Sequence, residues 1–409
     1  MLSQAVILCG GLGTRLGELT ASTPKPMLPV AGRPFLDHLI QEVARYGFSR
    51  VTLLAGQFGA QVQAAYDGRH LSGLAIDVVI EPSPMGTGGA LAVAEAVGRL
   101  DPEFLLMNGD SWIDMNLTTV ARHWQAARGT DPGLRAQLLL QTVPDAARYG
   151  TVTLDDGRVT AFREKSPDSA GQPGRINAGV YVLDRAVVAL VPADRPSSLE
   201  SDILPRLVAA RQVTGLAAPP GSYFIDIGLP ASYAQAQHEL VRQRTRPALF
   251  LDRDGTLNVD HGYTHRPEDL AWQPGAREAV KLANDAGYYV FVVTNQAGVA
   301  RGYYPEAAVA GFHAAMQRDL FAIGAHLDAL EWCPHHPEGH VEAYRKPCRR
   351  RKPAPGMIED LLAAWPVDRA RSLLVGDTGH DLAAAGAVGI RGVKYDGGSL
   401  LELVRRFIS

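Results

Sequence analysis

The sequence predicts an α/β protein built from two consecutive three-layer domains. Its 409 residues exceed the usual length of a single domain. Two short apolar runs, 5–8 and 248–251, are each typical of a buried strand, and each opens directly into a loop rich in glycine or aspartate. In an open parallel sheet, ligands bind where the strands end in such loops. The two strand-and-loop patterns therefore predict one ligand site in each half of the chain.

Composition excludes several classes of partner. The net charge of −3 provides no basic field for nucleic acid, and no apolar run approaches the ~20 residues that a membrane helix needs. Three cysteines, an odd number, follow an N-terminus that has no signal-peptide pattern, and this combination indicates a reducing cytoplasm. We therefore expect a cytoplasmic protein that binds neither nucleic acid nor a membrane. The sequence does not decide whether the protein forms a homo-oligomer.

The first strand opens into a glycine loop that runs from Cys9 to Leu16. Gly10, Gly11 and Gly13 let the backbone turn sharply and bring N–H groups close to an anion. The loop is not a dinucleotide fingerprint, because Leu16 stands at the third glycine position, and it is not a P-loop, because no Gly-Lys-Ser/Thr follows. It predicts an anion site of another kind.

Two cations accompany this loop. Arg15 stands at its end, and Lys25 lies between Pro24 and Pro26, whose rings fix where the lysine points. Two cations offset the charge of a triphosphate while backbone donors bind its oxygens. The segment therefore predicts a nucleoside triphosphate site.

This pattern resembles the sugar-1-phosphate nucleotidyltransferases, whose signature is Gly-Gly-x-Gly-Thr-Arg followed by Pro-Lys-Pro. The resemblance extends over most of residues 1–240 and implies a Rossmann-like nucleotidyltransferase fold. It implies that the nucleotide is bound by Gly10, Gly11, Gly13 and Thr14, that Arg15 and Lys25 are catalytic, and that the base and sugar of the nucleotide contact Gly86 and Gly88. It also implies that Lys165 contacts the sugar phosphate, that Asn177 contacts the sugar, and that Asp110 and Asp226 bind Mg²⁺. Ser166 replaces the proline of the family's Glu-Lys-Pro motif.

The implied chemistry is an in-line attack of a sugar phosphate oxygen on the α-phosphorus, with pyrophosphate as the leaving group. Positioning and charge neutralisation dominate such a reaction. Taken singly, Asp110 is also compatible with an ordinary turn after a strand, and Asp226 with a helix cap ahead of Pro230. The joint occurrence of the motifs favours the catalytic interpretation.

A helix over 231–244 closes the first domain, a short linker covers 241–247, and a second domain covers 248–409. Asp252 and Asp254 follow the strand 248–251 directly, and alternate residues of an extended segment point the same way. We expect these two carboxylates to face one pocket.

Three more motif segments follow along the chain. Thr294 ends an apolar strand, Lys352 precedes a helix-like segment at 357–365, and Asp377 follows the strand 372–375. Because the carboxyl ends of parallel strands share one edge of a sheet, these groups should converge with Asp252 and Asp254.

In this order, the four motifs resemble the haloacid dehalogenase (HAD) superfamily of phosphatases. The resemblance implies that Asp252 is the nucleophile that forms an aspartyl phosphate and that Asp254 is the acid and base. It implies that Thr294 holds phosphoryl oxygens, that Lys352 balances charge, and that Asp252, Asp254 and Asp377 bind Mg²⁺. Asp381, one helical turn beyond Asp377, is expected to support the site through a hydrogen bond.

Segments 250–258, 294–302 and 333–353 resemble more closely the D-glycero-D-manno-heptose-1,7-bisphosphate 7-phosphatases. This resemblance implies substrate contacts by Asn295, Arg301 and Arg351. It also implies a zinc site on Cys333, His335 and Cys348, although Arg350 replaces the family's fourth ligand. His336 or His340 could substitute, and the sequence leaves zinc binding open.

The two resemblances together predict a bifunctional enzyme of nucleotide-heptose synthesis that uses Mg²⁺. The second domain would remove the 7-phosphate of heptose 1,7-bisphosphate, and the first would join heptose 1-phosphate to a nucleotide, with GTP favoured. Alternatives are a hexose 1-phosphate, another base, a histidinol-phosphatase-like or general sugar phosphatase, and a domain that only binds.

Overall fold

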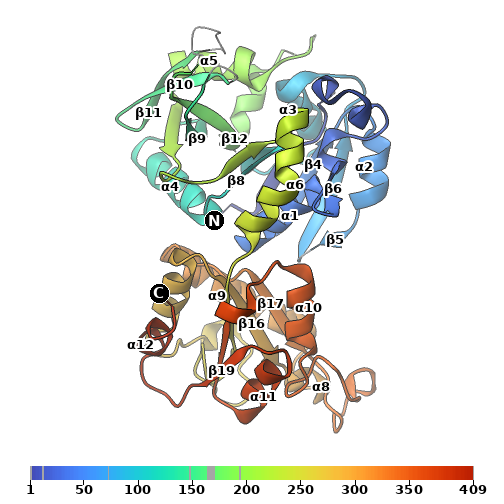
Figure 1. Ribbon diagram of the computed structural model, residues 1–409, viewed down its shortest axis with the longest axis vertical. Helices are drawn as coiled ribbons and strands as arrows, with labels where there is room; N and C mark the ends of the chain where they lie inside the picture. The colour runs from blue at the N-terminus through green and yellow to red at the C-terminus, as the bar shows by residue number, and fades with distance from the viewer. Residues whose placement is uncertain are drawn as a thin grey trace. The chain divides into compact units, whose positions relative to one another are not determined.

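The computed structural model describes residues 2–11, 13–71, 73–146, 149–163, 171–192 and 195–408. The chain folds into two compact units, one of residues 1–44 and 48–240 and the other of residues 45–47 and 241–409. Each unit is an α/β structure, so the predicted fold class is confirmed (Figure 1). Within the part of the chain that the structure describes, no helix has the length and apolarity to cross a bilayer.

The first unit is built on a ten-stranded mixed sheet with the order β10-β11-β13-β9-β12-β7-β1-β4-β6-β5. Its strands are β1 (Gln4–Leu8), β4 (Arg50–Ala55), β5 (His70–Leu71), β6 (Leu74–Ile80), β7 (Glu103–Asn108), β9 (Ala136–Val143), β10 (Thr151–Asp155), β11 (Arg158–Arg163), β12 (Gly174–Asp184) and β13 (Val213–Ala217). Two small antiparallel pairs join β2 (Pro29–Val30) to β3 (Arg33–Pro34) and β8 (Ser111–Ile113) to β14 (Phe224–Asp226). The first strand β1 pairs in parallel with β4 and β7, so the loop after β1 lies at the carboxyl edge of the sheet.

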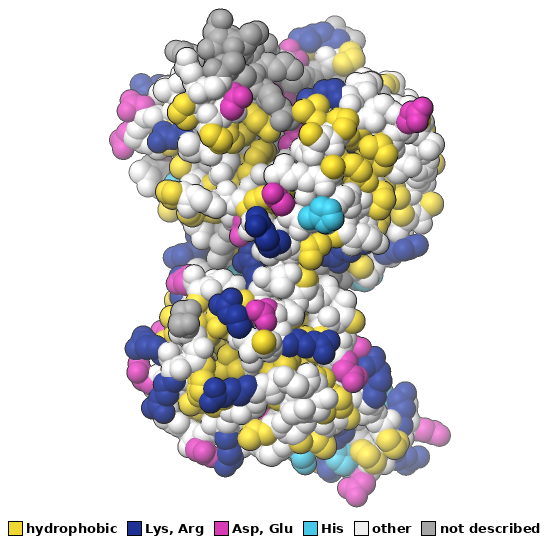
Figure 2. All heavy atoms as spheres, in the orientation of Figure 1, with side chains coloured by type: hydrophobic (Ala, Val, Ile, Leu, Met, Phe, Trp, Pro, Cys, Tyr) yellow, Lys and Arg dark blue, Asp and Glu magenta, His cyan; other side chains and the backbone are white. Residues whose placement is uncertain are grey.

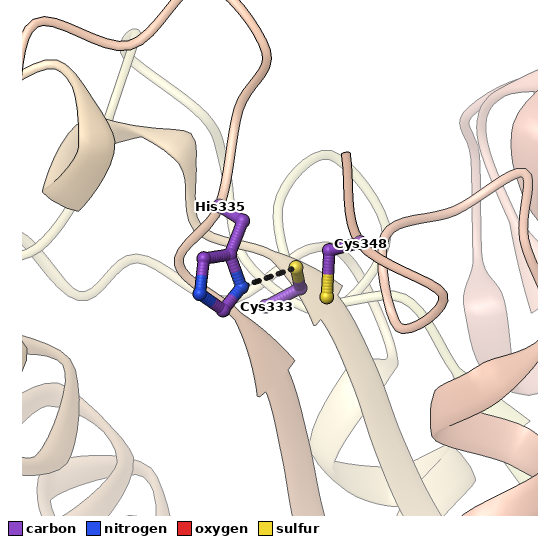
Figure 3. Close-up of side chains that lie close together, drawn as sticks. All are labelled: Cys333, His335 and Cys348. Atoms are coloured by element: carbon purple, nitrogen blue, oxygen red, sulfur yellow. Dashed lines mark hydrogen bonds between the residues drawn. The ribbon is translucent and has the colours of Figure 1, made fainter. Parts of the chain in front are cut away.

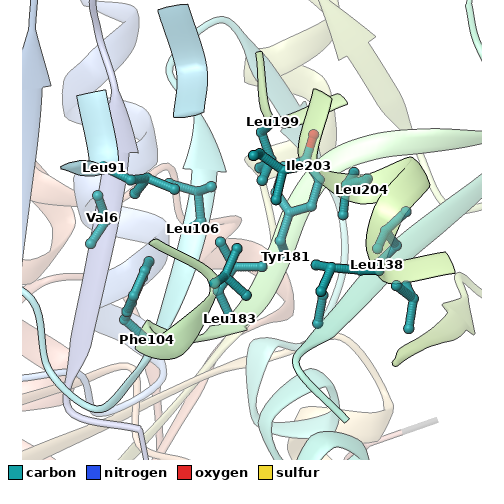
Figure 4. Close-up of a cluster of buried hydrophobic side chains, with 14 of the residues drawn as sticks. Val6, Leu91, Phe104, Leu106, Leu138, Tyr181, Leu183, Leu199, Ile203 and Leu204 are labelled. Atoms are coloured by element: carbon teal, nitrogen blue, oxygen red, sulfur yellow. The ribbon is translucent and has the colours of Figure 1, made fainter. Parts of the chain in front are cut away.

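Helices cover this sheet, and their apolar sides form its core. They are α1 (Phe35–Arg45), α2 (Gly59–Tyr66), α3 (Gly86–Ala96), α4 (Leu117–Thr130), α5 (Leu204–Ala209) and α6 (Pro230–Arg244). Figure 4 shows one part of the core, where Leu91 of α3 and Leu204 of α5 pack with Val6, Leu106 and Leu138 of the sheet. All of these side chains are buried, so this core fixes the strand ends that carry the site.

The second unit is a five-stranded parallel sheet with the order β17-β16-β15-β18-β19. Its strands are β15 (Ala248–Leu251), β16 (Tyr289–Asn295), β17 (Ala329–Cys333), β18 (Leu373–Gly376) and β19 (Arg391–Lys394), and its helices are α7 (Ala276–Asp285), α8 (Ala297–Ala300), α9 (Glu306–Ala322), α10 (Gly356–Ala364), α11 (Gly379–Ala387) and α12 (Leu400–Arg405).

Alternate strand residues of this sheet face opposite layers. Leu249 and Leu251 pack with α7, α9 and α12, whereas Ala248 and Phe250 pack with α10 and α11. The second unit therefore has three layers, and a strand that is covered on both faces is apolar along its whole length, as 248–251 is.

Acidic and basic side chains of the described residues are interspersed on the face drawn in Figure 2. This mixture agrees with the net charge of −3. It offers a polyanion no broad basic surface on that face.

Candidate active sites

In the first unit, two aspartates far apart in the sequence meet because two short strands pair. Ser111 of β8 lies opposite Asp226 of β14 in an antiparallel register, which places Asp110, just before β8, beside Asp226. Nζ of the buried Lys25 lies 2.5 Å from Asp110 Oδ2 and 3.6 Å from Asp226 Oδ1. The structure thus brings together the lysine and both aspartates that the sequence singled out.

A cavity of about 510 Å³ opens at these carboxylates, and Arg15, Asn177 and Glu200 also line it. An adjoining cavity of about 340 Å³ shares Asn177 and Glu200 with it. Cation, amide and carboxylate groups therefore surround a space that is large enough for a small phosphorylated ligand.

Backbone packing explains some of the predicted glycines and not others. A Cβ at Gly10 would lie 2.5 Å from Oε1 of Glu81, and a Cβ at Gly86 would lie 2.5 Å from the carbonyl oxygen of Ser197. The amide of Gly88 donates to the same carbonyl at 2.9 Å. At Gly11, by contrast, a Cβ would meet nothing within 4 Å, so packing alone does not require glycine there.

Gly13 has a left-handed φ of 63°, and Thr14 and Arg15 begin the 3-10 helix of residues 14–20 that follows it. Glycine adopts that backbone conformation at little cost, which explains its presence at the end of the loop. Lys165, also predicted for this site, lies outside the described residues.

Glu200 is a polar residue of this site that sequence reasoning missed. Its carboxylate accepts hydrogen bonds from Thr87 at 2.8 Å, Ser198 at 3.0 Å and the hydroxyl of Tyr181 at 3.0 Å. Tyr181 also receives a bond from Asn177 Nδ2 at 2.6 Å. No motif on the sequence marks Glu200, because its partners come from separate elements.

In the second unit, the predicted groups converge at the carboxyl edge of the sheet. Nζ of Lys352 lies 2.7 Å from Asp252 Oδ1 and 2.5 Å from Asp381 Oδ1, and it donates to the carbonyl oxygen of Val293 at 2.7 Å. Thr294, at the end of β16, is buried and accepts a bond from Gln296 at 2.9 Å. The lysine therefore pairs with two buried carboxylates at once.

Burial dominates the electrostatics of this edge. It raises the pKa of Asp252 to about 7, against the attraction of Lys352. Burial also raises the pKa of Asp377. For Lys352, burial disfavours the charge, but Asp252 and Asp381 outweigh it and raise its pKa. Without a further cation, the site thus holds more carboxylate than its one lysine can neutralise.

The acidic group fits a divalent cation. Ligand oxygens of Asp252, Asp377 and Asp381 lie within 4.8 Å of one another, and the buried Oδ1 of Asp377 has no hydrogen-bond partner among the described residues. A Cβ at Gly255 would lie 2.4 Å from Oδ2 of Asp377, so only glycine leaves room for that carboxylate. Asp254, also predicted as a ligand, is not in this group.

The carboxylate of Asp254 is held by three side chains. Arg253 donates to both oxygens at 2.9 and 2.8 Å, Asn258 donates to Oδ1 at 3.1 Å, and Gln296 donates to Oδ2 at 2.8 Å. Its position is thereby fixed within the site.

The three predicted substrate-side residues are placed differently from one another. The side-chain amide of Asn295 donates to the backbone carbonyl oxygen of Lys352 and accepts from its backbone N–H, both at 3.0 Å. Asn295 therefore holds the backbone of that lysine in place. Arg351 donates to the carbonyl oxygen of His335 at 3.3 Å. The guanidinium of Arg301 lies 6.0 Å from the ring of Tyr263.

A second group with metal-ligand chemistry begins at Cys333, the last residue of β17. Sγ of Cys333, Nδ1 of His335 and Sγ of Cys348 lie within 4.8 Å of one another, with 3.7 Å between Cys333 and His335 (Figure 3). These separations suit three corners of a tetrahedral zinc site. Arg350 pairs instead with Glu331 and, at 3.5 Å, with Asp360. Neither His336 nor His340 belongs to the group.

Comparisons with known proteins find relatives for both units. The family model for nucleotidyl transferases matches residues 4–243, and a HAD-hydrolase-like model matches residues 349–402. D-glycero-beta-D-manno-heptose-1,7-bisphosphate 7-phosphatase of Rhodopseudomonas palustris is 47% identical over 163 residues, which are 40% of this chain and 91% of that protein.

Two curated relatives match the first unit. Mannose-1-phosphate guanylyltransferase of Mycobacterium tuberculosis is 36% identical over 241 residues, 58% of this chain and 65% of that protein. D-glycero-alpha-D-manno-heptose 1-phosphate guanylyltransferase of Aneurinibacillus thermoaerophilus is 32% identical over 237 residues, 58% of this chain and 98% of that protein. The crystal structure of HddC from Yersinia pseudotuberculosis complexed with GMP-PN has 29% identity and a TM-score of 0.50, and the match covers 58% of this chain and 100% of that one.

The fold and the two sites define an enzyme that joins a nucleotidyltransferase to a phosphatase. The chain belongs to the nucleotidyl transferase family and, through its C-terminal part, to the family of the D-glycero-beta-D-manno-heptose-1,7-bisphosphate 7-phosphatases. The predicted fusion is confirmed, and both families generally use Mg²⁺.

Proposed function

We propose that the chain makes a nucleotide-activated heptose in two steps. Residues 248–409 would hydrolyse the 7-phosphate of D-glycero-D-manno-heptose 1,7-bisphosphate, residues 1–240 would transfer GMP from GTP to the resulting heptose 1-phosphate, and 241–247 would link them. One observation carries the proposal: a single chain matches a heptose bisphosphate phosphatase and a heptose 1-phosphate guanylyltransferase. The product named for the first reaction is the substrate class named for the second.

In the phosphatase step, Asp252 attacks the phosphorus of the 7-phosphate, and the bond to the sugar oxygen breaks as the aspartyl phosphate forms. Asp254 gives a proton to that oxygen and later takes one from the water that hydrolyses the aspartyl phosphate. Lys352 and Thr294 hold the phosphoryl oxygens. The covalent route divides one difficult step into two easier ones. Asp252 and Asp377, with Asp381 beside them, would hold Mg²⁺, which when bound offsets the charge of the phosphoryl group.

In the transferase step, a phosphate oxygen of heptose 1-phosphate attacks the α-phosphorus of the nucleotide, and pyrophosphate leaves. Arg15 and Lys25 offset the charge of the triphosphate, and the amides of the glycine loop bind its oxygens. Asn177 and Lys165 bind the sugar phosphate. Asp110 and Asp226, which face the same cavity, would hold Mg²⁺, which supplies further positive charge at the phosphates.

Guanine is favoured because both relatives of the first unit are named guanylyltransferases. The identity to a mannose-1-phosphate enzyme keeps a hexose 1-phosphate as the second candidate substrate. The names of the two heptose relatives differ in the anomer, beta for the phosphatase and alpha for the transferase. Coupling requires one anomer to pass through both sites, and we propose the alpha form, because it is the form named for the guanylyltransferase relative.

We also propose that Cys333, His335 and Cys348 bind zinc as a structural ion. The three ligand atoms already converge, and they join the end of β17 to the segment before Lys352. A metal that ties these two segments together would hold Arg351 and Lys352 at the edge of the phosphatase site.

The test is mass spectrometry of the nucleotide sugar. The full-length enzyme receives Mg²⁺, either anomer of heptose 1,7-bisphosphate and an equal mixture of ATP, CTP, GTP, UTP and dTTP. A single GDP-heptose product from the alpha anomer is the expected result. Conversion of supplied hexose 1-phosphates without any heptose product would show that the heptose assignment is wrong. In a matched control, Asp252→Asn should make no product from the bisphosphate and should still convert supplied heptose 1-phosphate.

A further inference from the structure

Arg253 stands between Asp252 and Asp254 in the sequence, and its side chain is fully buried. A fully buried arginine is rare unless it is paired, so its partners indicate what it does. Arg253 took no part in the sequence-based prediction, which treated it as the residue between two catalytic aspartates.

The partners of Arg253 join three parts of the unit. Nε and Nη2 donate to the two oxygens of Asp254 at 2.9 and 2.8 Å, in the two-point geometry that fixes a carboxylate best. Nη2 also donates to the carbonyl oxygen of Thr264 at 2.7 Å. The guanidinium lies 4.6 Å from the centre of the Phe312 ring of α9, which limits its movement on that side.

Thr264 belongs to the loop 259–266, which is stabilised by hydrogen bonds among its own residues. Oδ1 of Asp260 accepts from the amide of Gly262 at 2.9 Å and from Oγ1 of Thr264 at 3.2 Å, and Oγ1 of Thr264 accepts from the amide of His261 at 3.0 Å. Such bonds between side chains and backbone stabilise one conformation of the turn.

The tip of this loop lies beside Arg301, a residue that the family resemblance assigns to the substrate. Tyr263 is 40% exposed, its ring centre lies 4.8 Å from that of Tyr303, and the guanidinium of Arg301 lies 6.0 Å away. The φ of Tyr263 is 61°, a conformation that is strained for a bulky side chain and is typical of functional loops. A sugar phosphate at the site would therefore meet this loop.

We propose that Arg253 is a positioning residue that sets the place of Asp254 against the leaving oxygen and couples that place to the loop 259–266. The proposal rests on the proposed role of Asp254 in proton transfer. One guanidinium bonds both the carboxylate and the loop backbone, so contact of the substrate with the loop fixes the carboxylate through Arg253. Loss of the arginine leaves Asp254 with Asn258 and Gln296 alone, and these bond one oxygen each.

The proposal predicts that variants of Arg253 discriminate between leaving groups. A sugar alcohol leaves poorly without a proton, whereas an acidic phenol leaves without one. A positioned general acid accelerates such a step by about 10² to 10⁴. A purely structural defect would slow both classes of substrate by the same factor.

The experiment compares full-length wild type with Arg253→Met and Arg253→Lys in Mg²⁺. kcat/KM is measured for heptose 1,7-bisphosphate and for a series of aryl phosphates that includes p-nitrophenyl phosphate. We expect Arg253→Met to lose about 100-fold or more on the sugar ester and less than about tenfold on p-nitrophenyl phosphate. Arg253→Lys should fall between, because an ammonium keeps the charge but cannot form the two-point contact. Arg405→Met is the matched control, since the side chain of Arg405 is 55% exposed and pairs with Glu402 in α12, away from this loop; it should match wild type.

An equal loss on both classes of substrate, with unchanged Tm, would overturn the proposal, and so would wild-type rates for Arg253→Met. If Arg253→Met does not fold, Arg253→Lys decides by the same comparison. Asp254→Asn separates this proposal from the proposed function. Unchanged phosphate release by Asp254→Asn refutes the proposed role of Asp254 in proton transfer, whereas selective loss in Asp254→Asn but not in the Arg253 variants refutes only the role of Arg253.

Discussion

Asp252→Asn should stabilise the metal-free protein at alkaline pH while it abolishes phosphate release. Asp252 is 8% exposed, and burial raises the pKa of its carboxyl group from the ordinary 3.8 to about 7. Ionising this group therefore costs free energy in the folded state that it does not cost in the unfolded chain. Asparagine has nearly the same shape and carries no charge at any pH.

The magnitude follows from the two pKa values. At about 1.4 kcal/mol for each pH unit, the difference corresponds to about 4 kcal/mol. Because the folded pKa lies above the unfolded one, the stability is fully present below about pH 4 and is lost as the pH rises to about 7. The variant keeps Lys352 paired with Asp381 at 2.5 Å, so it does not leave a buried cation alone.

The assay is urea denaturation of the full-length protein in EDTA, followed through the transition of the C-terminal unit. At pH 8, Asp252→Asn should be more stable than wild type by up to about 4 kcal/mol, and at pH 4 the two should agree. Asp285→Asn, at a side chain that is 57% exposed, is the control and should show no such difference. Mg²⁺ should narrow the gap at pH 8, because it stabilises the folded wild type by binding its carboxylates. Equal or lower stability of Asp252→Asn at pH 8 would refute the reasoning.

Three other predictions concern separate parts of the chain. Burial, together with Arg253, lowers the pKa of His313 to about 3. The neutral ring therefore favours the folded state above about pH 6.5, and this contribution is lost as the pH falls toward 3. His313→Gln should lose less stability than wild type between pH 7 and pH 4; urea midpoints that fall equally in both proteins would contradict this. Lys25→Met should lower nucleotidyl transfer by about 100-fold or more, because it removes a buried cation from the proposed triphosphate site, and should leave phosphate release unchanged; a loss of both activities would show that the sites are not independent. Elemental analysis should find zinc in wild type, and Cys348→Ser should remove it, because the two remaining ligands hold zinc weakly. Wild type that is purified without chelators and contains no zinc would show that the metal assignment is wrong.

The sequence by itself determined the fold class and which strand ends gather at the candidate phosphatase site. Each motif follows an apolar run, and the carboxyl ends of parallel strands must share one edge, so Asp252, Thr294 and Asp377 converge whatever the connecting loops do. Lys352 precedes its helix, as its proline-rich context predicts. These features depend on local pattern and on a general rule of sheet geometry.

Only the tertiary structure decided which other groups serve each site. Asp110 and Asp226 meet through the pairing of β8 with β14, and Glu200 receives Tyr181 and Thr87 from distant elements. Arg253 could have pointed to solvent, but its partners Thr264 and Phe312 hold it inside. Such contacts depend on how loops close over long sequence separations, and no local periodicity encodes that closure.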